Sequence, residues 1–427
     1  MKIAIIGAGF SGLSTAYYLS KNSYDVTVFE SCDKPGGLAL SFKDNNWQWS
    51  LEGHYHHIFA SDIDVLNLAR AVGQKVFFKK PVSSTYLDGK IYQLDSPISL
   101  LKFNKLNFIE RLRTGAAIAF LKINPFWKPL EKITSYEFVS STMGKKSWEI
   151  IWKPLFVKKF GKYGMDINAA WFWARIKKRS SSLGYPEGGF GEFAKKIEKE
   201  IKKNSGKVIY NKSVNKIEKR GDKFIINVGN KGETFDKVIS TIPPKLFLDI
   251  AKNLPEEYVN GLSKLKSLGT INLILSLKES FLKEGSYWLN INDMDYPFLA
   301  LVEHTNLIDK EFYNNESLLY VVNYLSSNHK YFQYNEGQLL EEYLPYLKKI
   351  NNKFNKNMIN KAWIFKSDYT QPVVEVKRSG IIPPFETPIE GLYICNMEQI
   401  YPWDRGTNYA INLGNKVAEL VLKSKQP

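Results

Sequence analysis

The chain has 427 residues, of which 44% are hydrophobic, enough for two domains of ordinary size with packed cores. No apolar run reaches the roughly 20 residues that cross a bilayer, and two distant cysteines exclude a disulfide framework. The N-terminus enters a strand with no signal peptide before it, so we expect a cytoplasmic protein. The formal net charge of +16 favours acidic partners.

The first thirty residues follow the order of a dinucleotide-binding unit. Residues 2–6 are predicted to form a strand, residues 7–12 a glycine-rich turn that opens a helix, and residues 26–29 a second strand that ends at Glu30. The N–H groups and partial positive charge of the helix N-terminus favour bound phosphates. The carboxylate of Glu30 can accept hydrogen bonds from ribose hydroxyls and would repel a 2′-phosphate, which disfavours NADP.

Glycine is expected at each position of this turn for a separate physical reason. Gly7 permits the tight turn after the strand, Gly9 lets a pyrophosphate approach the backbone, and Gly12 lets the helix pack close to the sheet. The cofactor contacts expected in this unit are Gly7, Ala8, Gly9, Phe10, Ser11, Gly12, Glu30 and Ser31.

A glycine pair, Gly36 and Gly37, follows the acid by six and seven residues and favours FAD over NAD. With this pair, the N-terminal region resembles the flavin amine oxidase superfamily, which includes protoporphyrinogen oxidases, phytoene desaturases and monoamine oxidases. UDP-galactopyranose mutases share its cofactor domain. The resemblance implies FAD contacts at Gly36, Gly37 and Leu38, although many amine oxidases have Arg where Leu38 stands. Because Cys395 lies in a predicted buried strand, we expect the FAD to be non-covalent.

Three of the five histidines lie close together, after a strand predicted over residues 46–51. If the backbone is extended here, His54 and His56 face one side and His57 the other. By resemblance, the strand runs beside the flavin ring, and we expect His56 or His57 to touch flavin or substrate and act as catalytic residues. A metal site is the alternative, but one nearby acid and no ligating cysteine leave the ligand set incomplete, so we predict no metal.

Residues 102–179 hold 17 basic and 5 acidic residues and five of the ten tryptophans. This segment favours an anionic or amphipathic small-molecule substrate, or peripheral contact with an anionic membrane, over nucleic acid, for which no motif is present. A solvated cationic face is the plainer alternative. A helix is predicted over residues 108–123, and we expect its apolar side to pack inside the domain rather than lie at a membrane. That side consists of Ile109, Leu112, Ala116, Phe120 and Ile123.

The middle of the chain adds three expectations. By resemblance, residues 208–217 lie along the adenine, with a contact at Val214. Residues 189–194 match a second glycine motif, but the polar, turn-like stretch before them argues against a second nucleotide site. Glu303 and His304 end a predicted strand and are a second candidate catalytic pair from the other domain.

The C-terminal region is predicted to form a strand over residues 391–396, a turn, and a helix to about residue 422. In the superfamily this unit covers the flavin ring, with the helix N-terminus toward the pyrimidine end. The resemblance therefore implies cofactor contacts at Asn396, Arg405, Thr407, Asn408 and Ala410, with His57 as a further one.

We therefore predict an α/β fold with a discontinuous Rossmann-like FAD-binding domain and a second α+β substrate domain. The FAD domain comprises residues 1–60, 183–244 and 362–427, and the substrate domain comprises residues 61–182 and 245–361, with strands over 269–275 and 317–322. The function implied is an FAD-dependent oxidoreductase that takes a hydride from a C–N or C–C bond onto flavin N5. A mutase-type flavin isomerase acting on a sugar nucleotide and a flavin-binding protein without turnover are the alternatives.

Overall fold

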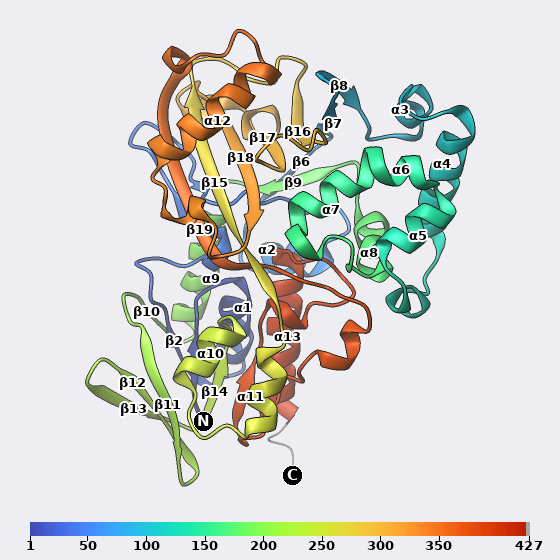
Figure 1. The fold of residues 1–427 in the computed structure, drawn as a ribbon. Coiled ribbons are helices and arrows are strands. Elements are labelled where there is room, and N and C mark those ends of the chain that lie inside the picture. The colour runs from blue at the N-terminus through green and yellow to red at the C-terminus, as the bar shows by residue number, and fades with distance from the viewer. Residues whose placement is uncertain (424–427) are drawn as a thin grey trace.

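The computed structural model describes residues 1–423, which form two packed sheet domains and a helical lobe (Figure 1). A five-stranded parallel sheet is the base of the first domain. Its strand order is β10 (Lys207–Ile209), β2 (Asp25–Phe29), β1 (Lys2–Ile6), β14 (Lys237–Ser240) and β20 (Leu392–Ile394). The chain therefore returns to this sheet from three distant segments, as expected of the discontinuous cofactor domain.

The five-stranded sheet is covered on both faces, which is why its strands read as continuous apolar runs. Alternate side chains of β1 enter different cores, Ile3 and Ile5 toward the helices and Ala4 and Ile6 toward a smaller sheet. Three helices cover the first face: α1 (Phe10–Lys21), α9 (Phe190–Lys203) and α13 (Thr407–Lys423). The second face is covered by α10 (Pro244–Ile250), near α11 (Glu256–Ser263), and by the sheet of β11 (Val214–Arg220), β12 (Lys223–Val228) and β13 (Lys231–Phe235).

The second domain is built on a seven-stranded mixed sheet. Its order is β19 (Ile359–Pro372), β15 (Ser267–Leu277), β18 (Ser317–Leu325), β17 (Ala300–Glu303), β16 (Ser286–Ile291), β7 (Val82–Leu87) and β8 (Lys90–Gln93). One face packs on α12 (Glu336–Ile350), and residues of the other face, among them Ile274 and Tyr320, join the core of the first domain. The strands expected over 269–275 and 317–322 are confirmed as neighbours in this sheet.

Two short sheets connect the domains. One pairs β3 (Ser41–Phe42) with β4 (Leu51–Glu52), and the other has the order β5 (Ile58–Phe59), β9 (Leu183–Pro186), β6 (Val76–Lys79). Helix α2 (Ile63–Ala71) follows β5 and packs on α13.

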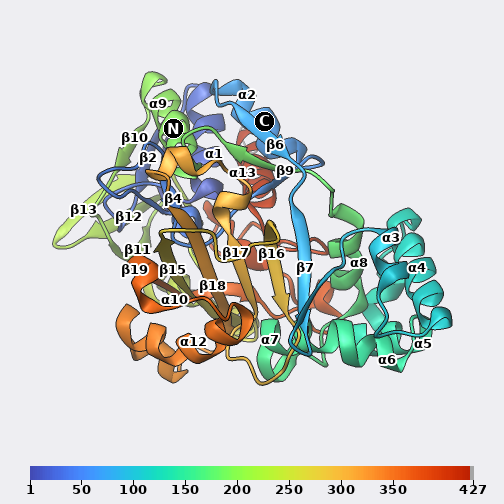
Figure 2. The same cartoon turned by 90° about the horizontal axis from the view of Figure 1, so that it is seen from above.

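The helical lobe lies to one side of the seven-stranded sheet (Figure 2). It contains α3 (Pro97–Lys102), α4 (Phe108–Ile123), α5 (Ser135–Thr142), α6 (Lys145–Ser147), α7 (Lys153–Phe160) and α8 (Ala169–Lys178). Asn107 begins α4 with a capping box, in which the Asn107 side chain accepts from the Glu110 N–H and the Glu110 carboxylate accepts from the Asn107 N–H. None of the helices within residues 1–423 has the length and apolar character needed to cross a bilayer.

Several sequence expectations need correction. Residues 362–372 belong to β19, which pairs with β15, so the expected domain boundary at 362 is wrong for this strand. The strand expected over 46–51 is reduced to β4, because a turn at residues 45–46 and a bend at 48–49 interrupt that stretch. A buried strand, β9, does precede the motif at 189–194, but it runs antiparallel to its neighbours. The other boundaries stay predictions, and residues 424–427 of the last segment lie outside the described residues.

Helix α4 has the expected bounds, but the prediction that its apolar side packs inside the domain is wrong. The helix buries Thr114, Ala117 and Leu121 instead. The expected apolar side, from Ile109 to Ile123, is exposed to solvent. Periodicity located this side of the helix, but it carries no information on which side meets the rest of the protein.

Candidate active site

In the glycine turn after β1, backbone atoms pack so closely that a side chain has no room at Gly12. Gly7 has a φ of +101°, and a Cβ at Gly12 would lie 2.0 Å from the carbonyl oxygen of Gly7. A Cβ at Gly37 would lie 2.9 Å from the Cα of Gly9, and the Gly36 N–H donates to the Ala8 carbonyl at 3.0 Å. The glycine pair thus folds back onto the first turn, so the two motifs predicted to hold one cofactor lie side by side.

Glu30 lies at the carboxyl end of β2, beside this turn. Its carboxylate accepts from the Ala8 N–H at 2.6 Å, from the Cys32 N–H at 2.9 Å and from the Ser31 hydroxyl at 3.2 Å. The Lys212 N–H donates to the Glu30 carbonyl at 2.8 Å. The chain leading to β11, which begins at Val214, therefore runs beside Glu30, as the expected adenine segment requires.

The C-terminal unit packs directly on the N-terminal unit (Figure 1). The Ser11 hydroxyl contacts the sulfur of Cys395 at 3.1 Å, and the Thr15 hydroxyl donates to the Gly414 carbonyl at 3.2 Å. A Cβ at Gly414 would lie 2.0 Å from the Ser14 hydroxyl oxygen, so α13 approaches α1 as closely as a glycine allows. The strands before both helices are parallel members of one sheet, so both helices begin at the same edge.

The expected cofactor residues of the C-terminal unit have different surroundings. Thr407 and Asn408 are buried, and the Asn408 side chain accepts from the Val65 N–H at 3.1 Å, which ties α13 to α2. The Ala410 N–H donates to the Gly406 carbonyl in the first turn. Arg405 points toward the seven-stranded sheet, because its Nε donates to Oε1 of Gln371 on β19 at 2.9 Å. A cofactor role for these side chains stays a prediction.

Two buried polar atoms at the same edge have no partner among residues 1–423, and they fit a bound dinucleotide. They are the hydroxyl of Ser240, at the end of β14, and the amide nitrogen of Asn396, just after β20. A buried donor or acceptor without a partner costs free energy, about 1–3 kcal/mol. Together with the open backbone at Gly9, where a Cβ would meet only Gly37, these atoms leave polar groups and space for FAD.

The three clustered histidines contact three different elements. Asn272 on β15 donates its amide to His54 Nδ1 at 2.8 Å, and His56 Nδ1 donates to the His54 carbonyl at 2.6 Å. His57 Nδ1 lies 3.4 Å from the Tyr287 hydroxyl on β16. A bend at His54 replaces the extended backbone on which the facing of His54 and His56 depended.

All three histidines are neutral at physiological pH. Burial lowers the pKa of His54 and of His57 to about 3 and that of His56 to about 4. The positive charge of Arg405 contributes to the lower pKa of His54 and of His56. The ring of His56 also lies 5.4 Å from that of Phe190, which in turn contacts Phe10 at the glycine turn. His56 therefore lies between the glycine turn and Arg405.

A polar cluster between the domains, here called the cation cluster, was not predicted except for Arg405. The hydroxyls of Tyr55 and Tyr324 are 2.7 Å apart, and Arg405 donates to the Tyr324 hydroxyl. Asp404 accepts from Trp171 Nε1 at 3.0 Å and pairs with two cations of the helical lobe. These are Lys159, 3.4 Å away, and Arg175.

The charges of the cation cluster do not balance, because the guanidinium groups of Arg175 and Arg405 and the amine of Lys159 face one carboxylate. Burial would raise the pKa of Asp404, but Lys159 and Arg175 hold it below its usual value, so it is ionised. Burial lowers the pKa of Lys159 well below its usual value, and neighbouring Arg175 lowers it further. The excess positive charge suits an anionic group of a substrate. Sequence analysis noted the basic segment but had no signal that brings Lys159 and Arg175 to Asp404.

Glu303 and His304 are held by structural partners. The carboxylate of Glu303 accepts from the backbone N–H groups of Phe281 and Leu282 at 3.0 and 2.6 Å. His304 Nε2 lies 2.8 Å from the Tyr313 hydroxyl, and burial lowers the pKa of His304 to about 3. These contacts occupy both side chains, and their catalytic role stays a prediction.

A buried carboxyl that sequence analysis did not select, Glu52, connects β4 to two other elements. It accepts from the Tyr185 hydroxyl at 2.7 Å and from the Phe190 N–H, at the start of α9, at 2.8 Å. Burial raises the pKa of Glu52 to about 7, although the hydrogen bonds from Tyr185 and Phe190 act to lower it. Within residues 1–423, no three His, Cys, Asp or Glu side chains lie close enough together to hold a metal ion.

A family model described as flavin containing amine oxidoreductase matches residues 10–422. The chain belongs to this family. The predictions of an amine oxidase-like α/β fold, of FAD as cofactor and of a family of oxidoreductases are thereby confirmed. The match begins at Phe10, just after Gly7 and Gly9, and it includes α1, the Gly36–Gly37 pair and α13 as far as residue 422.

Relatives with curated names fall into several oxidase classes. The chain is 26% identical over 293 residues to coproporphyrinogen III oxidase of Staphylococcus aureus, covering 58% of this chain and 61% of the relative. It is 25% identical over 340 residues to amine oxidase [flavin-containing] A of Canis lupus familiaris, covering 71% of this chain and 62% of the relative. The chain thus spans about three fifths of the length of these two relatives.

Solved structures share the fold over the whole chain. A putative protoporphyrinogen oxidase from Exiguobacterium sp. 255-15 superposes with a TM-score of 0.78 at 14% identity, covering 99% of both chains. A reduced UDP-galactopyranose mutase gives a TM-score of 0.75 at 18% identity, covering 100% of this chain and 96% of the other. Because oxidases and a mutase share this fold, the fold alone does not select between their reactions.

Proposed function

We propose that the protein is an FAD-dependent oxidoreductase that removes a hydride from a C–N or C–C bond of a small molecule with an anionic group. Family membership supports the reaction class. The cation cluster supports an anionic group on the substrate. It contains three basic side chains, Lys159, Arg175 and Arg405, but only one carboxylate, that of Asp404. This charge excess, beside the Tyr55–Tyr324 pair, is the observation that carries the proposal.

The residues at the glycine turn would hold the cofactor. The N-terminus of α1 and Gly9 would receive the pyrophosphate, and Glu30 would bind the ribose. Asn396 and Ser240 would gain hydrogen-bond partners that the described part of the chain does not give them. When bound, FAD supplies a hydride acceptor.

The rest of the site would orient the substrate and keep its surroundings dry. Arg405, fixed by Gln371 and Tyr324, would bind the anionic group, and the paired hydroxyls of Tyr55 and Tyr324 would position the carbon that is oxidised. Neutral His56 can accept a proton at Nε2, because its Nδ1 proton is donated to the His54 carbonyl. The aromatic side chains of Trp171 and Trp403 line the small cavity at Arg405 and exclude water there.

The test is anaerobic bleaching of the bound flavin. The purified yellow protein is mixed with amines, reduced tetrapyrroles and other reduced candidates with and without carboxylates, and absorbance is followed near the flavin maximum. We expect bleaching by a carboxylate-bearing compound and slower or no bleaching by its ester. Equal bleaching by acid and ester would contradict the anionic group, and no bleaching by any candidate would contradict the oxidase reaction.

A mutase-type isomerase is the second candidate. It is favoured by the segment His57–Ile58–Phe59, which resembles the histidine motif of galactopyranose mutases, and by a cation cluster that also suits a nucleotide diphosphate. Turnover of a sugar nucleotide only after the flavin has been reduced, with no electron consumption, would select this candidate. Turnover coupled to loss of electrons to an acceptor would exclude it.

A further inference from the structure

The helical lobe exposes an apolar surface, here called the α3–α4 face. It consists of Ile98, Leu101, Phe108, Ile109, Leu112, Phe120, Ile123 and Phe126. Ile123 is 79% exposed, Phe126 72% and Ile109 69%, so these are among the most exposed large hydrophobic side chains in residues 1–423. Residues scattered singly need no explanation, but a concentration on two adjacent helices marks an interaction surface.

The two helices that carry this face are held in fixed positions. Arg111 on α4 donates to the Leu101 carbonyl of α3, and the Arg113 guanidinium donates to the Ser141 and Thr142 carbonyls at the end of α5. These basic side chains of α4 therefore turn toward the protein and hold its neighbours. The apolar side of α4 faces outward and stays exposed, whereas the opposite side of the helix is buried in the lobe.

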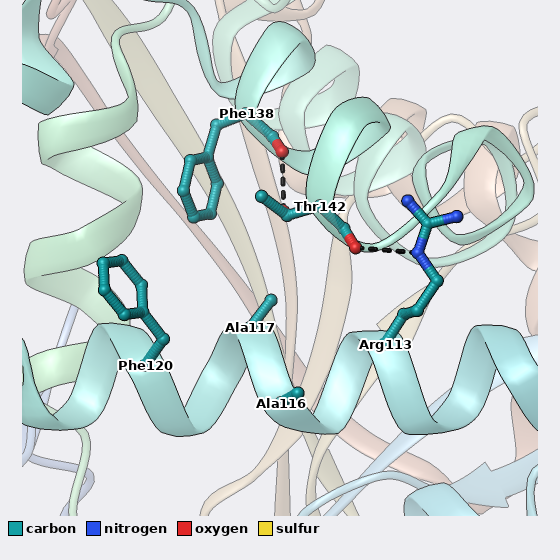
Figure 3. A pocket seen from close by; sticks show the side chains of 6 residues that line it. All are labelled: Arg113, Ala116, Ala117, Phe120, Phe138 and Thr142. Atoms are coloured by element: carbon teal, nitrogen blue, oxygen red, sulfur yellow. Dashed lines mark hydrogen bonds between the residues drawn. The ribbon is translucent and has the colours of Figure 1, made fainter.

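A groove continues the α3–α4 face between α4 and α5 (Figure 3). Its volume is about 380 Å³, and Phe120, which belongs to the face, lines it together with Ala116, Ala117 and Phe138. Figure 3 shows the side chains of α4 directed toward Phe138 and Thr142 of α5, with Arg113 at one end. An apolar groove of this kind extends the surface that a hydrocarbon chain can contact.

Positive charge surrounds the apolar side chains. Lys102, Lys122 and Lys128 are exposed beside the face, and the segment 102–179 carries 17 basic residues against 5 acidic ones. At the end of α4, Lys122 lies close to Lys177 and Arg179, since its ammonium donates to the Arg179 carbonyl and that of Lys177 donates to the Lys122 carbonyl. Partial burial and these two positive neighbours lower the pKa of Lys122, as in a cationic cluster that lacks its anion.

Charge complementarity selects the occupant. A second copy of the chain would bring two positive rims together, and nucleic acid offers no hydrocarbon surface for the exposed phenylalanines. An anionic bilayer matches both features, because its headgroups are negative and its acyl chains accept apolar side chains at the interface. We propose that the α3–α4 face docks the protein on the surface of an anionic phospholipid membrane.

The face lies in the same lobe that supplies Lys159 and Arg175 to the cation cluster. Trp173 of α8 donates to the Asn124 carbonyl just after α4, and its ring lies 5.2 Å from that of Trp403. An amphipathic substrate held in the bilayer would therefore meet the protein near its site. This last step rests on the proposed function, whereas membrane docking itself does not.

Vesicle binding of the FAD-loaded protein tests the proposal without any substrate. Co-sedimentation is measured with vesicles of phosphatidylcholine alone and with vesicles containing about 30% phosphatidylglycerol. We expect the anionic vesicles to bind at least about tenfold more protein, and added salt to weaken the binding. Equal binding to both vesicles, or none to either, would overturn the proposal.

Three variants assign the binding to this face. We expect the triple variant I109S/I123S/F126S to lose binding about tenfold or more. A matched control, L246S/M294S/I381S, removes exposed apolar side chains outside the lobe and should bind within about twofold of the unchanged protein. The charge variant K102E/K128E should also weaken binding to anionic vesicles, and it keeps the test valid if the triple variant loses its flavin absorbance. Unchanged binding in the variants of the face, or a dimer in sedimentation velocity that the triple variant dissociates in the absence of vesicle binding, would overturn the assignment.

Discussion

The glycine turn of the cofactor domain and the α3–α4 face of the helical lobe place opposite demands on side chains. At the turn, a single methyl group has no room, since a Cβ at Gly12 would lie 2.0 Å from the Gly7 carbonyl oxygen. On α4, a Cβ at Gly115 would meet only the Leu100 side chain, at 3.7 Å. A site made of backbone atoms can therefore be recognised in the sequence from glycines at fixed spacing. A surface site cannot, because it depends on which side of a helix the rest of the chain leaves exposed.

The largest effect that would sharpen this comparison comes from Gly12→Ala. We expect loss of bound FAD, because the methyl group forces α1 away from the sheet at the pyrophosphate position. The ratio of flavin to protein absorbance measures it. The matched control Gly115→Ala should retain FAD and gain about 0.5–1 kcal/mol of stability, as Ala does in a helix. Normal FAD content in Gly12→Ala would break the comparison.

The next effect concerns Glu52, whose pKa burial raises from 4.5 to about 7. The folded state holds this proton more tightly than the unfolded state, so its contribution is complete below about pH 4.5 and is lost as the pH rises through about 7. The loss is at most about 3 kcal/mol. Between pH 4.5 and 8, the thermal unfolding temperature should therefore fall less steeply with pH in Glu52→Gln than in the unchanged protein.

Glu137→Gln in the helical lobe is the control for Glu52→Gln. The pKa of Glu137 is lowered by hydrogen bonds from Thr134 at the start of α5, so its contribution is present above its usual pKa and is lost as the pH falls. The two variants should thus alter the pH dependence of unfolding in opposite directions. Parallel curves for the unchanged protein and Glu52→Gln would contradict a raised pKa at Glu52.

A smaller effect is expected from Arg405→Lys, at a residue that links the two regions because its chain neighbour Asp404 pairs with Arg175 of the lobe. Lysine keeps the charge but cannot contact Gln371 and Tyr324 together, so we expect kcat/KM for an anionic substrate to fall about 10- to 100-fold. FAD absorbance should be unchanged. Arg220→Lys, on the exposed end of β11, should leave kcat/KM unaltered.

The smallest effect tests the lobe alone. Ile109→Ser should change the free energy of unfolding by no more than about 0.5 kcal/mol, because the side chain is already in solvent. Leu121→Ala on the opposite side of α4 should cost about 2–5 kcal/mol, because Leu121 is fully buried. Denaturant unfolding measures both. A large loss in Ile109→Ser would show that the α3–α4 face is covered in solution.

The secondary structure around the glycine turn could be predicted from the sequence because its requirements are local. The turn at Gly7 and Gly12, the pair Gly36–Gly37 and the bounds of α13 follow from steric and capping rules within short segments. Their assembly at one edge follows from the parallel sheet, in which β1 and β20 end together.

The rest depended on contacts between distant segments. Lys159 and Arg175 reach Asp404 only because α7 and α8 fold back toward the turn before α13, and no spacing in the chain records that approach. Residues 362–372 were assigned to the FAD domain, but they pair with β15 in the seven-stranded sheet, and the pattern of a strand does not show which sheet it joins. Which side of α4 is buried depended likewise on the packing of the whole lobe.

The close packing of α1 on α13 has a consequence for synthesis of the protein. Ser11 and Cys395, which touch in the folded structure, are 384 positions apart. At a translation rate of roughly 5–20 residues per second, about 20 to 80 seconds separate their emergence from the ribosome. During that interval the surface of α1 at Ser11, Ser14 and Thr15 lacks the helix that covers it in the folded structure, so we expect the nascent chain to expose this surface until α13 has been made.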